Sequence, residues 1–92
     1  MSLKDQVHLQ SLKASYPQAV EKSYQQWIQT YISYHDGKHP ILMGANELKS
    51  FLLYLNYTLG LPRQAMKHAF TALEFLYTKV FDTKIPRFEE LV

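Results

Sequence analysis

Two histidines flanking an aspartate are the residues of this sequence whose types and spacing best suit metal chemistry. His35 and His39 lie four positions apart, with Asp36 between them. Two histidines at i and i+4 on one helix can share a metal ion, but Gly37 and Pro40 interrupt any helix here. We therefore expect a turn in which Asp36 hydrogen-bonds to the backbone and His39 faces solvent, and we predict no metal site.

Few other side chains suit catalysis. Glu89 and Glu90 form a carboxylate pair near the C-terminal end, where we expect both to be solvated. The chain has no cysteine, which excludes a thiolate zinc site, a disulfide framework and a cysteine nucleophile. The three glycines are scattered and form no phosphate-binding loop. The sequence therefore indicates no cofactor and no small-molecule substrate.

Length and composition indicate one small globular domain. The chain has 92 residues, of which 47% are hydrophobic. Ten basic and eight acidic residues give a net charge of only +2, so any binding of nucleic acid must come from a local patch. The first residues lack the apolar run of a signal peptide. No stretch approaches the roughly 20 apolar residues that span a bilayer, and we expect a cytoplasmic protein with no membrane partner.

Hydrophobic spacing predicts the elements that must position any site. Apolar residues recur at intervals of three and four, which is typical of amphipathic helices, and they predict helices at about 3–14, 17–36, 45–59 and 62–81. The expected buried stripes are Leu3, Val7, Leu9 and Leu12; Val20, Tyr24, Trp27, Ile28, Tyr31, Ile32 and His35; Leu48, Phe51, Leu52, Leu55 and Leu59; and Met66, Ala69, Phe70, Leu73, Leu76, Tyr77 and Val80. Residues 85–88 form an extended exit, and residues 89–92 either begin another element or trail off. The prediction is an all-α fold, a compact bundle of four helices in a single domain over residues 1–92.

Five segments between Tyr16 and Leu91 share an order and spacing with one known family. They are Tyr24-x-x-Trp27-Ile28-x-x-Tyr31-Ile32-x-x-His35, Lys38-His39-Pro40 followed by Met43-Gly44, Glu47-Leu48-x-x-Phe51-Leu52-x-x-Leu55, Ala72-Leu73-x-Phe75-Leu76-Tyr77-x-Lys79-Val80, and Ile85-Pro86 followed by Glu89-Glu90. Together they resemble the N-terminal SAM-like core-binding domain of phage integrases, and most closely that of integron integrases, which are tyrosine site-specific recombinases.

The resemblance implies a non-catalytic DNA-binding domain, one half of a clamp that closes around a duplex. The other half cuts and rejoins DNA with a tyrosine nucleophile, and we expect that catalytic domain to be absent from these 92 residues. Such chemistry needs several cations preorganised around one phosphate, whereas the two arginines, Arg63 and Arg87, fall on separate predicted elements. Tyr77 falls on an apolar stripe, and we interpret it as a core or boundary residue.

The resemblance also implies that exposed sides of the second and fourth helices face the major groove. The corresponding positions are Gln25, Gln26, Gln29 and Ser33, then Arg63, Gln64, Lys67, His68 and Thr71, with Lys38 and His39 as loop contacts to the DNA backbone. Lysine can neutralise a phosphate, and glutamine can read an adenine edge. Taken singly, each of these residues is also typical of a solvated helix face.

Several departures from the family pattern predict weak attraction to DNA. Basic residues usual in the family are replaced here by Gln29 and Ser33, and Ala19-Val20 stand where a basic residue and a threonine are usual. The fourth helix opens with Gln64-Ala65-Met66-Lys67-His68 in place of Ser-Thr-Gln-Asn-Gln. Each lost phosphate contact reduces the slope of log affinity against log salt concentration by nearly one unit.

Two further functional classes stay open. A stand-alone protein-interaction module would expose an apolar patch, from Tyr34, Tyr54, Tyr57, Phe81 or Phe88, and self-associate without DNA. An independent enzyme has almost no support. The leading hypothesis predicts double-stranded DNA and neighbouring integrase protomers as partners, in a prokaryotic cytoplasm.

Overall fold

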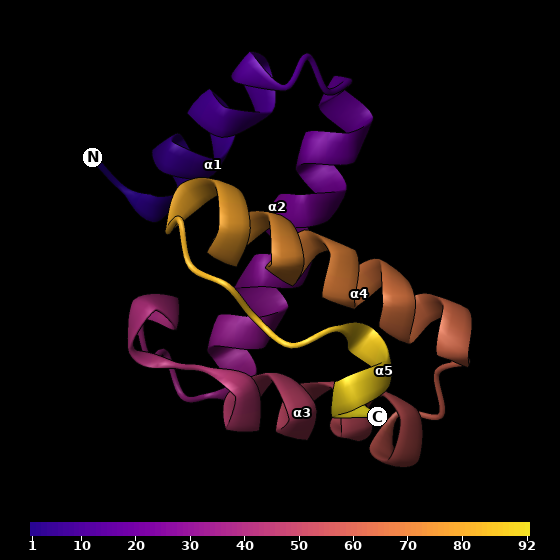
Figure 1. Ribbon diagram of the computed structural model, residues 1–92. Coiled ribbons are helices and arrows are strands. Elements are labelled where there is room, and N and C mark those ends of the chain that lie inside the picture. Colours follow the sequence, from indigo (N-terminus) through magenta and orange to yellow (C-terminus); the bar gives the residue numbers. More distant parts are fainter.

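A computed structural model describes all 92 residues, and every regular element in it is helical. The helices are α1 (Leu3–Lys13), α2 (Gln18–Tyr34), α3 (Ala45–Leu53), α4 (Arg63–Phe75) and α5 (Phe88–Leu91) (Figure 1). A 3-10 turn, Pro40–Leu42, precedes α3, and π-helical turns continue α3 over Tyr54–Thr58 and α4 over Leu76–Val80. The all-α prediction is confirmed, and the chain adds α5 to the four expected helices. No helix combines the length and apolar character needed to cross a bilayer.

Local chemistry explains where the helices begin and end. The Ser2 side chain caps α1 by accepting a hydrogen bond from the Asp5 N–H at 3.1 Å. The chain leaves α2 through two residues of positive φ, Asp36 at 58° and Gly37 at 81°. The Gly37 N–H then donates to the Ile32 carbonyl at 2.9 Å, which satisfies one of the orphan carbonyls of the helix end.

The core lies where α2 crosses α4 and where α3 and α5 close the other side (Figure 1). The stripes predicted on α2, α3 and α4 supply most of the 17 residues of the buried cluster. Phe88 and Leu91 of α5 join it, at 5% and 4% exposure. The extended segment before α5 therefore carries the chain back across the bundle and returns apolar side chains to the core.

Three leucines of the predicted stripes are exposed, contrary to expectation: Leu9, Leu12 and Leu59. Helix α1 packs on α2 and on the π-helical turn that follows α4, and it buries Val7 and Ser11. Ser11 tolerates burial because its hydroxyl donates to the Val7 carbonyl at 2.8 Å. Leu59 follows the π-helical turn after α3, where the wider turn breaks the 3.6-residue register of the stripe.

A chain of buried hydrogen bonds ties α4 to the 3-10 turn. The Tyr77 hydroxyl donates to the Pro40 carbonyl at 2.6 Å, and the hydroxyls of Tyr31 and Tyr77 lie 3.2 Å apart. Burial raises the pKa of both phenols above the ordinary value. Tyr77 is therefore a neutral core residue, as the apolar spacing predicts.

Candidate nucleic-acid interface

The five candidate residues of α4 share one exposed side of its first three turns. Met66, Ala69 and Phe70 face the core from the same turns, so helical periodicity leaves the intervening positions to solvent. The exposed set is Arg63, Gln64, Lys67, His68 and Thr71. The structure thus brings together every candidate predicted on this helix.

The N-terminal end of α4 is open. Pro62 precedes the helix and provides no side-chain cap. The N–H groups of Ala65 and Met66 donate to the Pro62 carbonyl at 3.0 and 3.2 Å. The earlier N–H groups, of Arg63 and Gln64, receive no cap and carry the partial positive charge of the helix end. This end suits a phosphate group.

Two cations of this surface lie against an aromatic ring. The guanidinium carbon of Arg63 is 4.9 Å from the centroid of Phe88, and the ammonium of Lys67 is 5.8 Å from it. Phe88 was a candidate for an exposed patch, and that expectation is wrong because α5 folds back onto the core. Arg87, the residue before Phe88, forms a surface ion pair with Glu90, with Nε and Oε1 2.9 Å apart. This pairing raises the pKa of Arg87 and lowers that of Glu90.

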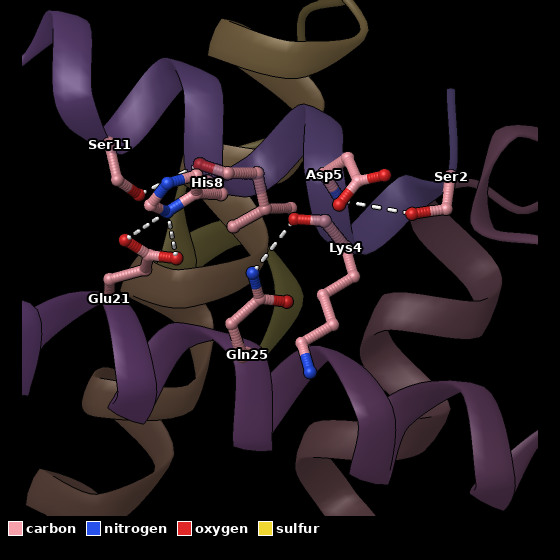
Figure 2. Close-up of polar contacts among 8 residues, drawn as sticks. Ser2, Lys4, Asp5, His8, Ser11, Glu21 and Gln25 are labelled. Atoms are coloured by element: carbon pink, nitrogen blue, oxygen red, sulfur yellow. Dashed lines mark hydrogen bonds and ion pairs between the residues drawn. The ribbon is translucent and has the colours of Figure 1, made fainter.

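The glutamines of α2 face a different neighbour, α1. The Gln25 amide donates to the Lys4 carbonyl at 3.0 Å, as Figure 2 shows, so this side chain is committed to the packing of α1. Gln26 and Gln29 are exposed. They line a groove of about 520 Å³ between the two helices together with Lys4 and Lys22.

Sequence reasoning missed the charged residues of the α1–α2 groove. Lys22 precedes Gln26 by four residues and Gln29 by seven, a spacing that places it on the same helical side and could have revealed it. Lys4 reaches the groove only because α1 packs on α2. His8 and Glu21 form a hydrogen bond across the same groove, with Nδ1 and Oε2 2.8 Å apart (Figure 2).

A second groove, of about 360 Å³, separates α2 from α4. His68 and Thr71 line one wall. The opposite wall consists of residues from the first two turns of α2: Ala19, Val20, Ser23 and Tyr24. His68 and Thr71 therefore face the start of α2 and not Gln25, Gln26 or Gln29. The Thr71 hydroxyl donates to the Lys67 carbonyl at 2.9 Å and keeps its lone pairs for a ligand.

The remaining candidates lie in the last turn of α2 and in the loop that follows it. Ser33, Lys38 and His39 are all exposed. The side chain that bonds the backbone of this turn is that of His39, whose Nδ1 accepts from the Ile41 N–H at 3.1 Å, and not that of Asp36 as predicted. His35 turns away from it, with Nε2 3.0 Å from the Glu47 carbonyl. No three histidines or carboxylates cluster as metal ligands would.

The predicted apolar patch does not form as one surface. Tyr34 and Tyr54 are half-buried and stack with ring centroids 4.5 Å apart. Phe81 is half-buried against Tyr77. Of the five candidates, Tyr57 alone is strongly exposed, at 81%. The packing of the other four rings removes most of the surface on which the interaction-module hypothesis depends.

Comparison with known proteins identifies the family. Residues 4–87 match the family described as phage integrase, N-terminal SAM-like domain. Two relatives named integrase/recombinase, from Escherichia coli and Pseudomonas aeruginosa, are each 30% identical to this chain over 76 residues. The matched segment is 83% of this chain and 23% of each relative, so the chain spans about a quarter of the length of these curated relatives. The chain belongs to the family of phage integrase N-terminal SAM-like domains.

Proposed function

We propose that this domain grips duplex DNA for a site-specific tyrosine recombinase of the integrase type. The observation that carries the proposal is the exposed side of α4, where two cations without carboxylate partners adjoin an uncapped helix N-terminus. The family of the chain and the names of its longer relatives support a role in DNA integration or recombination. The sequence resemblance to integron integrases extends this proposal to that class, acting in a prokaryotic cytoplasm.

In this proposal the residues of α4 have distinct tasks. Arg63 and Lys67 neutralise phosphates, and the free N–H groups of the first turn donate hydrogen bonds to a phosphate oxygen. Gln64 has the amide needed to pair with an adenine edge in the major groove. The reaction itself belongs to a catalytic domain supplied by the rest of the recombinase.

The α1–α2 groove extends the proposed surface along α2. Lys4 and Lys22 provide two more cations there, beside Gln26 and Gln29. Glu21 reduces the local charge, and it pairs with His8. The net charge of the chain is only +2, so we expect weak, salt-dependent binding by the domain alone.

Fluorescence anisotropy with a labelled duplex tests the proposal. We expect a dissociation constant in the micromolar range or weaker that rises between about 50 and 200 mM salt. Arg63→Ala and Lys67→Ala should each weaken binding and reduce the salt slope by about 0.9, the share of one phosphate. Lys49→Ala, which removes an exposed lysine from α3, is the matched control and should bind like the wild type.

The outcomes separate the alternatives. Equal losses in all three variants would mean that only overall charge matters and would refute a specific role for α4. Absence of binding at about 50 mM salt, by a folded protein, would refute DNA gripping by this domain.

A second candidate function is contact with neighbouring protomers. It is favoured by two adjacent apolar side chains on the 3-10 turn, Ile41 and Leu42, which are 62% and 68% exposed. Sedimentation velocity with and without duplex tests this role. If these residues mediate self-association, the wild type forms dimers and Leu42→Ser remains monomeric; a wild type that is monomeric in both conditions excludes it.

A further inference from the structure

The ring of Phe88 is a fixed platform beneath two side chains of α4. Arg63 and Lys67 are one helical turn apart, and their charged ends lie 4.9 and 5.8 Å from the ring centroid. The ring itself is 5% exposed and packs edge-to-face on Phe70, with centroids 5.7 Å apart. Helix α5, which carries the ring, also packs on α3. The platform is therefore held by the core and not by the surface.

A cation over an aromatic face is ordered without losing its hydrogen-bond donors. The attraction comes from the quadrupole of the ring, so the N–H groups of the cation remain free for a phosphate. Long basic side chains otherwise lose rotamer entropy when they bind. Arg87 illustrates the opposite arrangement, because its Nε already donates to Glu90 at 2.9 Å.

We propose that Phe88 is a positioning residue that preorganises Arg63 and Lys67 for the DNA backbone. The inference rests on the proposed function and adds a residue that touches no DNA itself. It implies that α5, more than 20 residues after Arg63 in the sequence, determines how the α4 surface presents its charge.

Side-chain NMR of the free protein tests the geometry without DNA. In the wild type, the Arg63 Hδ and Lys67 Hε protons should be shifted upfield by the ring current of Phe88. Phe88→Leu should abolish both shifts, and Phe88→Met is a second variant that keeps apolar volume at the site. Phe51→Leu, a change of the same type in the α3 core, should leave the shifts unchanged. Wild-type shifts at random-coil values would overturn the inference.

Duplex binding tests the consequence through a mutant cycle. Phe88→Leu should weaken binding by up to about 5- to 30-fold, the worth of two exposed cation–π contacts, and should flatten the salt dependence. The same substitution in an Arg63→Ala, Lys67→Ala background should change the affinity less than about 2-fold. Phe51→Leu should have no effect in either background, with folding of each variant checked by thermal unfolding.

Each outcome has a distinct meaning. An equal loss from Phe88→Leu in both backgrounds would show that the ring acts only through the fold and would overturn the inference. Unchanged affinity in the wild-type background would also overturn it while leaving the proposed function intact. Absence of duplex binding by the wild type would instead refute the proposed function, and the inference with it, even where the ring-current shifts are present.

Discussion

Replacing Tyr77 with phenylalanine removes one hydroxyl from the hydrogen-bond chain that ties α4 to the 3-10 turn. In the wild type this hydroxyl donates to the Pro40 carbonyl at 2.6 Å and lies 3.2 Å from the hydroxyl of Tyr31. Pro40 and Tyr31 are both buried. The variant therefore leaves a buried carbonyl without its donor and a buried phenol without its acceptor.

The size of the effect follows from that geometry. A buried polar group left unsatisfied costs about 1–3 kcal/mol, so we expect Tyr77→Phe to lower the free energy of unfolding by about 2–3 kcal/mol. For a domain of this length, each kcal/mol corresponds to about 4–8 °C in the melting temperature. The variant should melt roughly 8–24 °C below the wild type, on the same scale.

Two further variants calibrate this prediction by urea and thermal unfolding. Tyr31→Phe keeps the Tyr77–Pro40 bond and should cost only about 1 kcal/mol. Tyr34→Phe breaks a bond to the Ser50 hydroxyl at the surface and should change stability by less than about 0.5 kcal/mol. The Tyr31→Phe, Tyr77→Phe double variant should cost less than the sum of the single changes, because it removes the stranded phenol hydroxyl.

The order of the three single variants is the decisive result. A Tyr77→Phe protein as stable as the wild type would show that the Pro40 carbonyl finds another partner. A larger loss from Tyr31→Phe than from Tyr77→Phe would reverse the inferred direction of the hydrogen-bond chain. Either result would refute the reasoning.

Three other predictions concern a cap, a turn and a surface pair. The Glu47 carboxylate accepts a hydrogen bond from the Gly44 N–H at 2.6 Å at the start of α3, and this bond holds the pKa of Glu47 below the ordinary 4.5. Glu47→Gln should lower the free energy of unfolding by about 1 kcal/mol at neutral pH. The difference between variant and wild type, measured by urea unfolding, should vanish as the pH falls below about 4.5 through the lowered pKa. Gly37 has φ of 81°, so Gly37→Ala should lower the free energy of unfolding by about 1 kcal/mol and Gly37→Asn by less. Equal melting temperatures of the two variants would contradict this prediction. Glu90→Gln frees Arg87 from its ion pair and should steepen the salt dependence of duplex binding by up to about 0.9, whereas an unchanged slope would place Arg87 outside the DNA surface.

The candidates predicted on α4 share one exposed side of that helix, whereas those predicted on α2 do not form one free surface. The spacing of apolar residues is enough to predict that Arg63, Lys67 and Thr71 are exposed, because helical periodicity assigns the other side of α4 to the core. It cannot show that Gln25 donates to Lys4, because that bond requires knowing which side of α2 receives α1. Ring stacking at Tyr34 likewise depends on a neighbour from another helix.

The sequence by itself determined the helices, their apolar stripes and the family. The helices and most of their stripes follow from local information, since propensity, capping residues and a period of 3.6 act within a few turns of chain. The family resemblance rests instead on the order and spacing of the five motifs. Only the tertiary structure decided that Leu12 faces solvent and that Phe88 enters the core. Burial is a property of pairs of elements, and α5 is too short at four residues to carry a periodic signal of its own. The same packing places Phe88 beneath Arg63 and Lys67, where residues distant in sequence share one surface.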